Sequence, residues 1–111
     1  MAKFLALYMG SAAGAAPAQP DAATIAKGMS AWQGWMEEHA KAVVDSGGPL
    51  GKTKKTSKTG IADFKNAIAG YVIVEAASHD AAAKLFLNHP HFAIFPGDAV
   101  EIMEVMPIPG R

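Results

Sequence analysis

The sequence predicts an α+β domain of the ferredoxin-like βαββαβ type, with a four-stranded antiparallel sheet and two helices on one face of it. Two runs, Phe4–Met9 and Tyr71–Ala76, are apolar on both of their alternating faces, which is typical of central strands covered on both sides. Each run is followed by a loop and then by a segment with a helical apolar pattern. Strands separated by two helices in this order favour such a sheet.

Length and composition restrict the class of protein. The chain has 111 residues, which suits a single domain over residues 1–111. Half of the residues are hydrophobic and 18% are charged, which favours a folded core over disorder. The formal net charge is +0; this argues against a nucleic-acid or membrane-surface partner and tolerates self-association. With no cysteine, disulfides, thiolate metal sites and cysteine nucleophiles are excluded.

The amino terminus resembles a signal peptide only superficially. Lys3 precedes the apolar run Phe4–Met9, and small residues follow. One lysine and so short a run are weak signals for secretion, and the run is needed as a strand. No stretch of the sequence is long enough to span a bilayer, so a cytoplasmic protein with no membrane partner is expected.

The first helix is expected to follow a loop over Gly10–Pro20. Asp21 or Thr24 can cap it, because either side-chain oxygen can accept from free amides of the first turn. Gly47 and Gly48 are expected to end it, since glycine readily adopts the left-handed backbone of a helix end. Apolar residues recur at helical steps along the segment: Ile25, Met29, Trp32, Met36, Ala40 and Val43.

The remaining elements follow from local signals. Gly51–Thr59 mixes four lysines with threonines, which predicts an exposed edge strand; it lacks the aromatic residues that would stack on single-stranded nucleic acid. Gly60–Ala67 is expected to be a loop. Ser78 can cap a second helix, which Pro90 is expected to end. Ala99–Met106 is the expected final strand.

This arrangement leaves one sheet face without a cover. Both helices are expected on the same face because each crossover connection is right-handed. The opposite face of the two central strands is nevertheless apolar, and large exposed apolar faces mark interaction sites. A second copy of the chain is the expected cover, which makes the protein a homodimer.

Several segments in order resemble the YCII-related domain family. They are Gly48-Pro-Leu, Gly70-Tyr-Val-Ile-Val-Glu-Ala, His89-Pro-His and Pro96-Gly-Asp-Ala-Val-Glu-Ile-Met-Glu-Val. The resemblance runs over nearly the whole chain and implies a ferredoxin-like dimeric α/β barrel, in which two sheets pack face to face and enclose a cleft. Some relatives resemble lyases or isomerases of small ring-derived acids, which implies a small organic acid as a partner.

The resemblance also implies a histidine from the first helix paired with an aspartate shortly after the Gly-Pro-Leu turn. His39 fits the first position, and imidazole can act as a general acid or base near neutral pH. Gly51–Lys55 contains no carboxylate, so the pair must recruit another group. Glu101 on the last strand is the favoured substitute, since a carboxylate in an apolar cleft can serve as an acid or base. The other candidate carboxylates are Asp45, Asp63 and Glu75.

Other side chains are candidates for ligand contacts. Tyr8 and Ser11 lie near the end of the first strand, and Trp35 can stack on a ligand or belong to the core or an interface. His89 and His91 flank a proline, but the neighbouring sequence supplies no third ligand, and a shaped turn with histidines bonded to backbone carbonyls is favoured over a metal site. Neither a metal nor a cofactor is expected.

Two functions of different classes fit these features. One is a small cleft enzyme that performs elimination or isomerisation on a small organic acid. The other is a non-catalytic dimeric module that binds a metabolite or a protein. The missing aspartate favours the module, and the apolar cleft with several polar groups favours the enzyme.

Overall fold

The computed structural model describes residues 1–10 and 20–110. The elements of this part are β1 (Ala2–Met9), α1 (Ala22–Glu38), β2 (Val43–Pro49), β3 (Thr53–Ser57), β4 (Gly60–Phe64), β5 (Ile68–Ala76), α2 (His79–Lys84), α3 (Pro90–Ala93) and β6 (Ala99–Glu104). In these residues no helix is long and apolar enough to cross a membrane.

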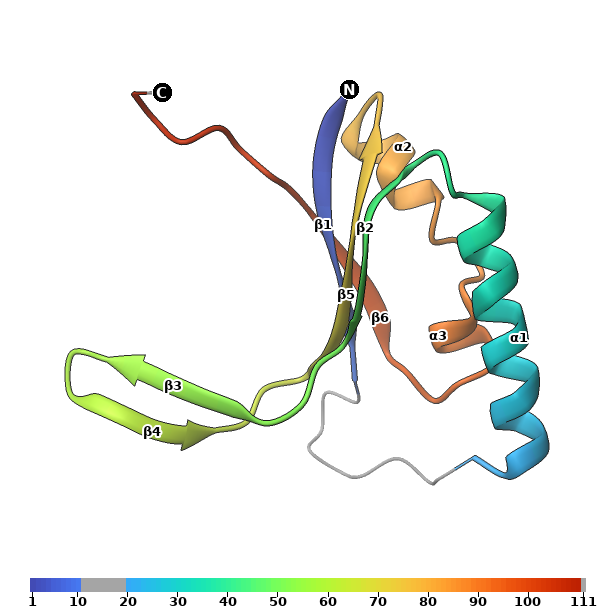
Figure 1. The fold of residues 1–111 in the computed structure, drawn as a ribbon, viewed down its shortest axis with the longest axis horizontal. Helices are drawn as coiled ribbons and strands as arrows, with labels where there is room; N and C mark the ends of the chain where they lie inside the picture. Colours follow the sequence, from blue (N-terminus) through green and yellow to red (C-terminus); the bar gives the residue numbers. More distant parts are fainter. Residues whose placement is uncertain (11–19, 111) are drawn as a thin grey trace.

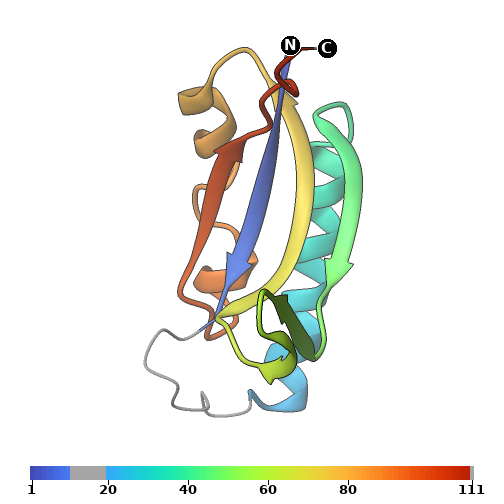
Figure 2. The same ribbon diagram turned by 90° about the vertical axis from the view of Figure 1, so that its left-hand side faces the viewer.

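The main sheet has the strand order β2-β5-β1-β6, and all of its neighbouring strands are antiparallel. The three helices lie on one side of it (Figures 1 and 2). The predicted α+β class and four-stranded antiparallel sheet are therefore confirmed, and the arrangement is compatible with a ferredoxin-like fold. The two-stranded sheet of β3 and β4 projects from the other side of the main sheet, as does the carboxy-terminal segment (Figure 1).

The first helix begins as the sequence indicates but ends earlier. The Asp21 carboxylate accepts a hydrogen bond from the Thr24 backbone N–H at 2.7 Å, so Asp21 is the N-cap. The prediction that the helix continues to Val43 is wrong, because α1 ends at Glu38 and His39 is its C-cap. Val43 and Val44 are β-branched and favour the extended backbone that they adopt in β2.

The glycines expected to stop the helix instead shape β2. Gly47 has a positive φ of 61°, and a Cβ atom there would lie 1.9 Å from the carbonyl oxygen of Tyr71 on β5. The register between β2 and β5 shifts between Asp45 and Gly48, and the Asp45 carboxylate accepts from the Gly47 N–H at 2.9 Å. Glycine is required here by an irregularity within a strand, not by a helix end.

The lysine-rich segment is not an edge strand of the main sheet, and that prediction is wrong. Residues Thr53–Ser57 pair with Gly60–Phe64 in a separate hairpin, so the expected loop at Gly60–Ala67 contains a strand. The lysines and threonines are almost all exposed. A segment without an apolar face has no apolar side chains to bury against α1. The edge of the main sheet beside β5 is therefore formed by β2.

The second helical region is also divided differently from the prediction. Ser78 caps α2 and accepts from the Ala81 N–H at 3.0 Å. Pro90 does not end this helix; it is the first residue of α3, and His89 is the N-cap of α3. A proline fits that position because the first helical N–H has no intrahelical partner. Asn88, with φ of 58°, makes the left-handed turn between the two helices.

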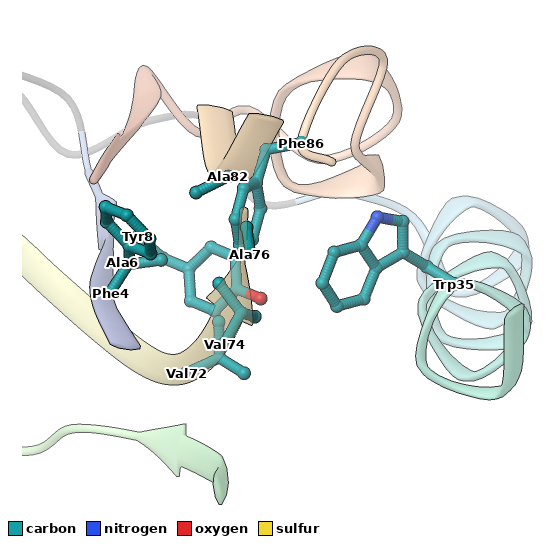
Figure 3. Close-up of a cluster of buried hydrophobic side chains, with 9 residues drawn as sticks. All are labelled: Phe4, Ala6, Tyr8, Trp35, Val72, Val74, Ala76, Ala82 and Phe86. Carbon is teal, nitrogen blue, oxygen red and sulfur yellow. The ribbon is translucent and has the colours of Figure 1, made fainter. Parts of the chain in front are cut away.

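The core lies between the sheet and the helices (Figure 3). Alternate residues of β1 and β5 point into it, and Trp35 reaches toward them from α1. Its buried members are Phe4, Ala6, Tyr8, Trp35, Val72, Val74, Ala76, Ala82 and Phe86. The alternation on β1 and β5 places Tyr8 on the helix side and leaves their other residues on the opposite side, called here the open face.

Candidate functional site

A cavity of about 270 Å³ lies on the helix side, between α1, the end of β2, the start of β5 and the end of β1. None of its described lining residues is acidic, lysine or arginine. This volume is near the lower limit of small-molecule sites in proteins, which span ~300–1,000 Å³, and it suits a ligand with one ring. The lining consists of Tyr8, Met29, Trp32, Ser46, Gly48, Pro49, Ala69, Gly70, Tyr71 and His91.

Close backbone packing forms the floor of the cavity. Gly70 is opposite Tyr8 in the β1–β5 ladder. A Cβ atom on Gly70 would lie 3.0 Å from the Gly48 carbonyl oxygen and 3.4 Å from the Tyr8 ring. Glycine therefore lets β2 and the tyrosine ring approach the same point of β5.

His89 lies behind Tyr8 and is completely buried. His89 is the N-cap of α3, and its Nδ1 atom accepts a hydrogen bond from the His91 backbone N–H at 3.0 Å. Its Nε2 atom lies 3.4 Å from the Tyr8 hydroxyl oxygen. Burial, with a smaller contribution from His91 and His39, lowers the pKa of His89 to about 4, so this imidazole is neutral at physiological pH.

His91 both lines the cavity and is anchored to β1. Its Nε2–H donates to the Met9 carbonyl oxygen at 2.7 Å, which leaves Nδ1 as the free nitrogen of the neutral ring. Gly97 packs directly against this ring, because a Cβ atom at Gly97 would lie 2.4 Å from His91 Cε1 and Nε2. The carbonyl of one strand and the backbone of a loop thus fix the position of His91.

Tyr8 and Trp32 complete an aromatic wall. Their ring centroids are 4.8 Å apart, and Trp32 meets His89 edge to face at 4.6 Å. Tyr8 lies 5.3 Å from His91 by the same measure. Burial raises the pKa of Tyr8 well above its ordinary value of about 10. Tyr8 is therefore a neutral phenol, able to donate a hydrogen bond but not to act as a phenolate near pH 7.

The structure places His39 and Glu101 on different sides of the sheet. His39 is half-buried at the end of α1, and its ring lies 4.8 Å from that of Trp35. Glu101 is exposed on β6 and is opposite Leu7, which belongs to the open face. The two expected partners are not brought together within one chain.

The other residues predicted to contact a ligand lie in different places. Tyr8 lines the cavity. Trp35 is buried in the core, where its Nε1–H donates to the Leu85 carbonyl oxygen at 2.9 Å, and with His39 it borders a second, more polar hollow of about 610 Å³. Ser11 lies outside the described residues. Among the described residues, no group of three or more potential metal-ligating side chains gathers.

The sequence does not identify His91 as a cavity residue, and for Trp32 it favours a core role over stacking on a ligand. It predicts His89-Pro-His as a shaped turn with histidines bonded to backbone carbonyls, and His91 does bond the Met9 carbonyl. A local signal for buried histidines existed, because the two histidines precede the apolar run Phe92–Phe95 and histidine is often partly buried. Their approach to Tyr8, 81 residues away in sequence for His89, is set by the tertiary fold.

Comparison with known proteins defines the fold further. Neither a protein-family model nor a curated protein sequence matches the chain. Among solved structures, the chain is similar to 5-chloro-2-hydroxyhydroquinone dehydrochlorinase from Burkholderia phenoliruptrix AC1100, which was solved in complex with 2,5-dihydroxybenzoquinone. The similarity has a TM-score of 0.57 and an identity of 18%, and it covers 94% of this chain and 93% of the other. Because the identity is low, the comparison shows that the two proteins share a fold.

Proposed function

We propose that the protein is a YCII-related enzyme that performs acid–base chemistry, elimination or isomerisation, on a small ring-derived organic acid in the cavity beside Tyr8 and His91. The observation that carries this proposal is a largely apolar cavity whose lining brings together the Tyr8 phenol and the His91 imidazole, beside Tyr71 and Ser46. The dehydrochlorinase that shares the fold binds a compound of one ring, which supports a ligand of that size.

In the proposed reaction His91 and Tyr8 act on different parts of the substrate. Nδ1 of His91 takes a proton from a carbon next to a carbonyl group, and Tyr8 donates a hydrogen bond to the carbonyl oxygen, where negative charge develops. Loss of a leaving group with its bonding electrons from the adjacent carbon completes an elimination. Return of the proton from His91 to a different carbon completes an isomerisation.

A homodimer is part of this proposal. On the open face Leu5 lies opposite Ile73 on one side and Met103 on the other, and Met103 is 39% exposed. Charged residues border this apolar strip, since Lys3 pairs with Glu75 across β1 and β5. A second copy, with the same strip, is the proposed cover, and Glu101 would then lie at the interface between the subunits.

A catalytic role for His39 stays a separate prediction. His39 borders the second hollow, where Lys84 and Asn88 supply polar groups. The alternative function, a non-catalytic module that binds a metabolite, uses the same cavity as the enzyme. The absence of a carboxylate from the described lining of the cavity favours this alternative, because no acid there can orient the imidazole.

Binding and turnover of a panel of single-ring hydroxy acids and ketones test the proposal. A true ligand raises the melting temperature and shifts the NMR signals of Tyr8, Trp32 and His91. If only the signals of His39 and Lys84 shift, the ligand binds in the second hollow and not in the cavity. Conversion of the ligand to a product, at a rate that falls by about 10²–10⁴ in the His91→Asn variant, indicates an enzyme. Stable binding without turnover indicates the module, and no binding by any panel member contradicts both.

A further inference from the structure

We propose that His89 is a positioning residue that fixes Tyr8 as a hydrogen-bond donor to the cavity, so that the ligand is a single planar ring carrying a carbonyl or enolate oxygen. This inference rests on the proposed function of the cavity. It follows from the direction of each hydrogen bond in a buried chain from His91 through His89 to Tyr8.

The first step is the tautomer of His89. A backbone N–H can only donate, so the 3.0 Å contact from His91 to Nδ1 requires Nδ1 to be unprotonated. A neutral imidazole with a free Nδ1 carries its proton on Nε2. The lowered pKa of His89 agrees with a ring that does not become doubly protonated near neutral pH.

The second step is the role of the Tyr8 oxygen. Since Nε2 of His89 carries a proton, the 3.4 Å contact is a donation from His89 to the Tyr8 oxygen. The phenol O–H bond prefers to lie in the plane of its ring. It cannot point toward His89, because the proton on His89 Nε2 already occupies that side of the Tyr8 oxygen. The Tyr8 proton therefore turns away from His89, and among the described residues no acceptor bonds this proton.

The third step is the chemistry of the ligand. A buried hydroxyl donor without an acceptor is unfavourable, and an acceptor oxygen on the ligand removes that penalty. The described lining offers no lysine or arginine to pair with a carboxylate, so on a ring-derived acid the oxygen expected to face Tyr8 is a carbonyl or enolate oxygen, whose charge is partial or delocalised. The Tyr8 and Trp32 rings, tilted by 58° to each other, each offer an aromatic face on which a planar ring can stack.

Two compounds that differ in one group test the donor. 4-Hydroxyacetophenone has a ketone where 4-ethylphenol has a methylene group, so the ring, its hydroxyl and the shape are matched. We expect the wild-type protein to bind the ketone about tenfold more tightly by calorimetry, the worth of one buried hydrogen bond. In Tyr8→Phe the preference is expected to vanish, because 4-ethylphenol binding changes little while ketone binding weakens.

His89 is tested through its proton and through a conservative variant. Histidine side-chain ¹⁵N NMR of the unliganded wild-type protein should show His89 protonated on Nε2 at pH 7; protonation on Nδ1 overturns the inference without any variant. His89→Gln keeps an N–H donor near the Nε2 position and should retain the ketone preference, whereas His89→Leu should lose it. His79→Gln, which changes a histidine bonded to the Ile102 carbonyl, is the matched control.

The outcomes separate this inference from the proposed function. If other panel compounds bind but the ketone is not preferred over 4-ethylphenol, the donor role of Tyr8 is wrong and the proposed function stands. If Tyr8→Phe retains the preference, the donor is a different group. If nothing in the panel binds the cavity, the proposed function fails together with its ligand class.

Discussion

At the scale of single residues, burial decides the protonation state of His89. The imidazole is completely buried and its pKa is about 4, whereas an unfolded chain has the ordinary value of about 6.5. Between these two pKa values the unfolded chain binds a proton that the folded chain does not, so stability falls as the pH falls through this window. The same burial makes His89 suitable as a fixed donor to Tyr8.

We expect acid denaturation to show this linkage. Above pH 6.5 the titration of His89 should leave the free energy of unfolding unchanged. Between pH 6.5 and pH 4 that free energy should fall by up to about 3 kcal/mol, because each unit of pKa difference is worth about 1.36 kcal/mol. Urea denaturation at a series of pH values measures it. His89→Gln should have a smaller fall than the wild type in this window. Equal falls in the two proteins would assign the acid sensitivity to other groups.

Gly97 gives a second residue-scale prediction. Gly97→Ala should lower stability by about 1–3 kcal/mol, as overpacking does, because the new Cβ atom would lie 2.4 Å from the His91 ring. It should also weaken ligand binding, since His91 must move. Gly34→Ala is the matched control: no heavy atom lies within 4 Å of its Cβ position, and alanine in a helix should add up to about 1 kcal/mol. Calorimetric melting checks both variants.

At the scale of elements, the sequence predicted the central strands and the start of α1 but misplaced β2. The sequence identifies β1 and β5 because each is a run of apolar residues on both faces, and both faces are buried or partly covered in the structure. The position of β2 depends on Gly47, whose left-handed backbone fits either a helix end or a strand irregularity. The contact with the Tyr71 carbonyl selects the second, and such a tertiary contact cannot be read from the local pattern.

The β3–β4 hairpin should tolerate changes of charge. Lys54 forms an exposed ion pair with Asp63, and the Lys55 Nζ atom lies 4.9 Å from the centre of the Phe64 ring. Exposed pairs of this kind contribute little, so the double change of Lys54 and Lys55 to glutamine should alter the free energy of unfolding by no more than about 0.5 kcal/mol. A much larger loss in urea denaturation would mean that the hairpin is buried against another chain.

At the scale of the whole molecule, the candidate site depends on pieces that are distant in sequence. The sequence predicts a ligand contact for Tyr8 from its place at the end of a strand; Tyr8 lies in the cavity lining, and the contact itself stays a prediction. His91 and Trp32 join it only because the α1 and α3 helices meet over the end of β1. The sequence pairs His39 with Glu101, but the sheet separates them. The strand period of two puts Glu101 on the open face, opposite Leu7, whereas His39 ends α1 on the helix side.

The open face leads to the last prediction, which concerns assembly. Leu5 lies on this face, between Ile73 and Met103 of the neighbouring strands, and the strand alternation directs its side chain away from the helices. Light scattering at micromolar concentration should give twice the chain mass of 11.5 kDa. Leu5→Glu should give the monomer mass, because burying an unpaired carboxylate between two apolar sheets is costly.

The control for this variant lies on the opposite side of the molecule. Ala83 is exposed on α2, so Ala83→Glu adds the same charge without touching the open face and should keep the dimer mass. The Leu5→Glu chain should retain its cavity, because Tyr8 and His91 belong to the helix side of the sheet. If the monomeric variant still binds the ligand, the site is complete within one subunit. A wild-type protein with the mass of one chain would contradict the dimer and leave the open face to another partner.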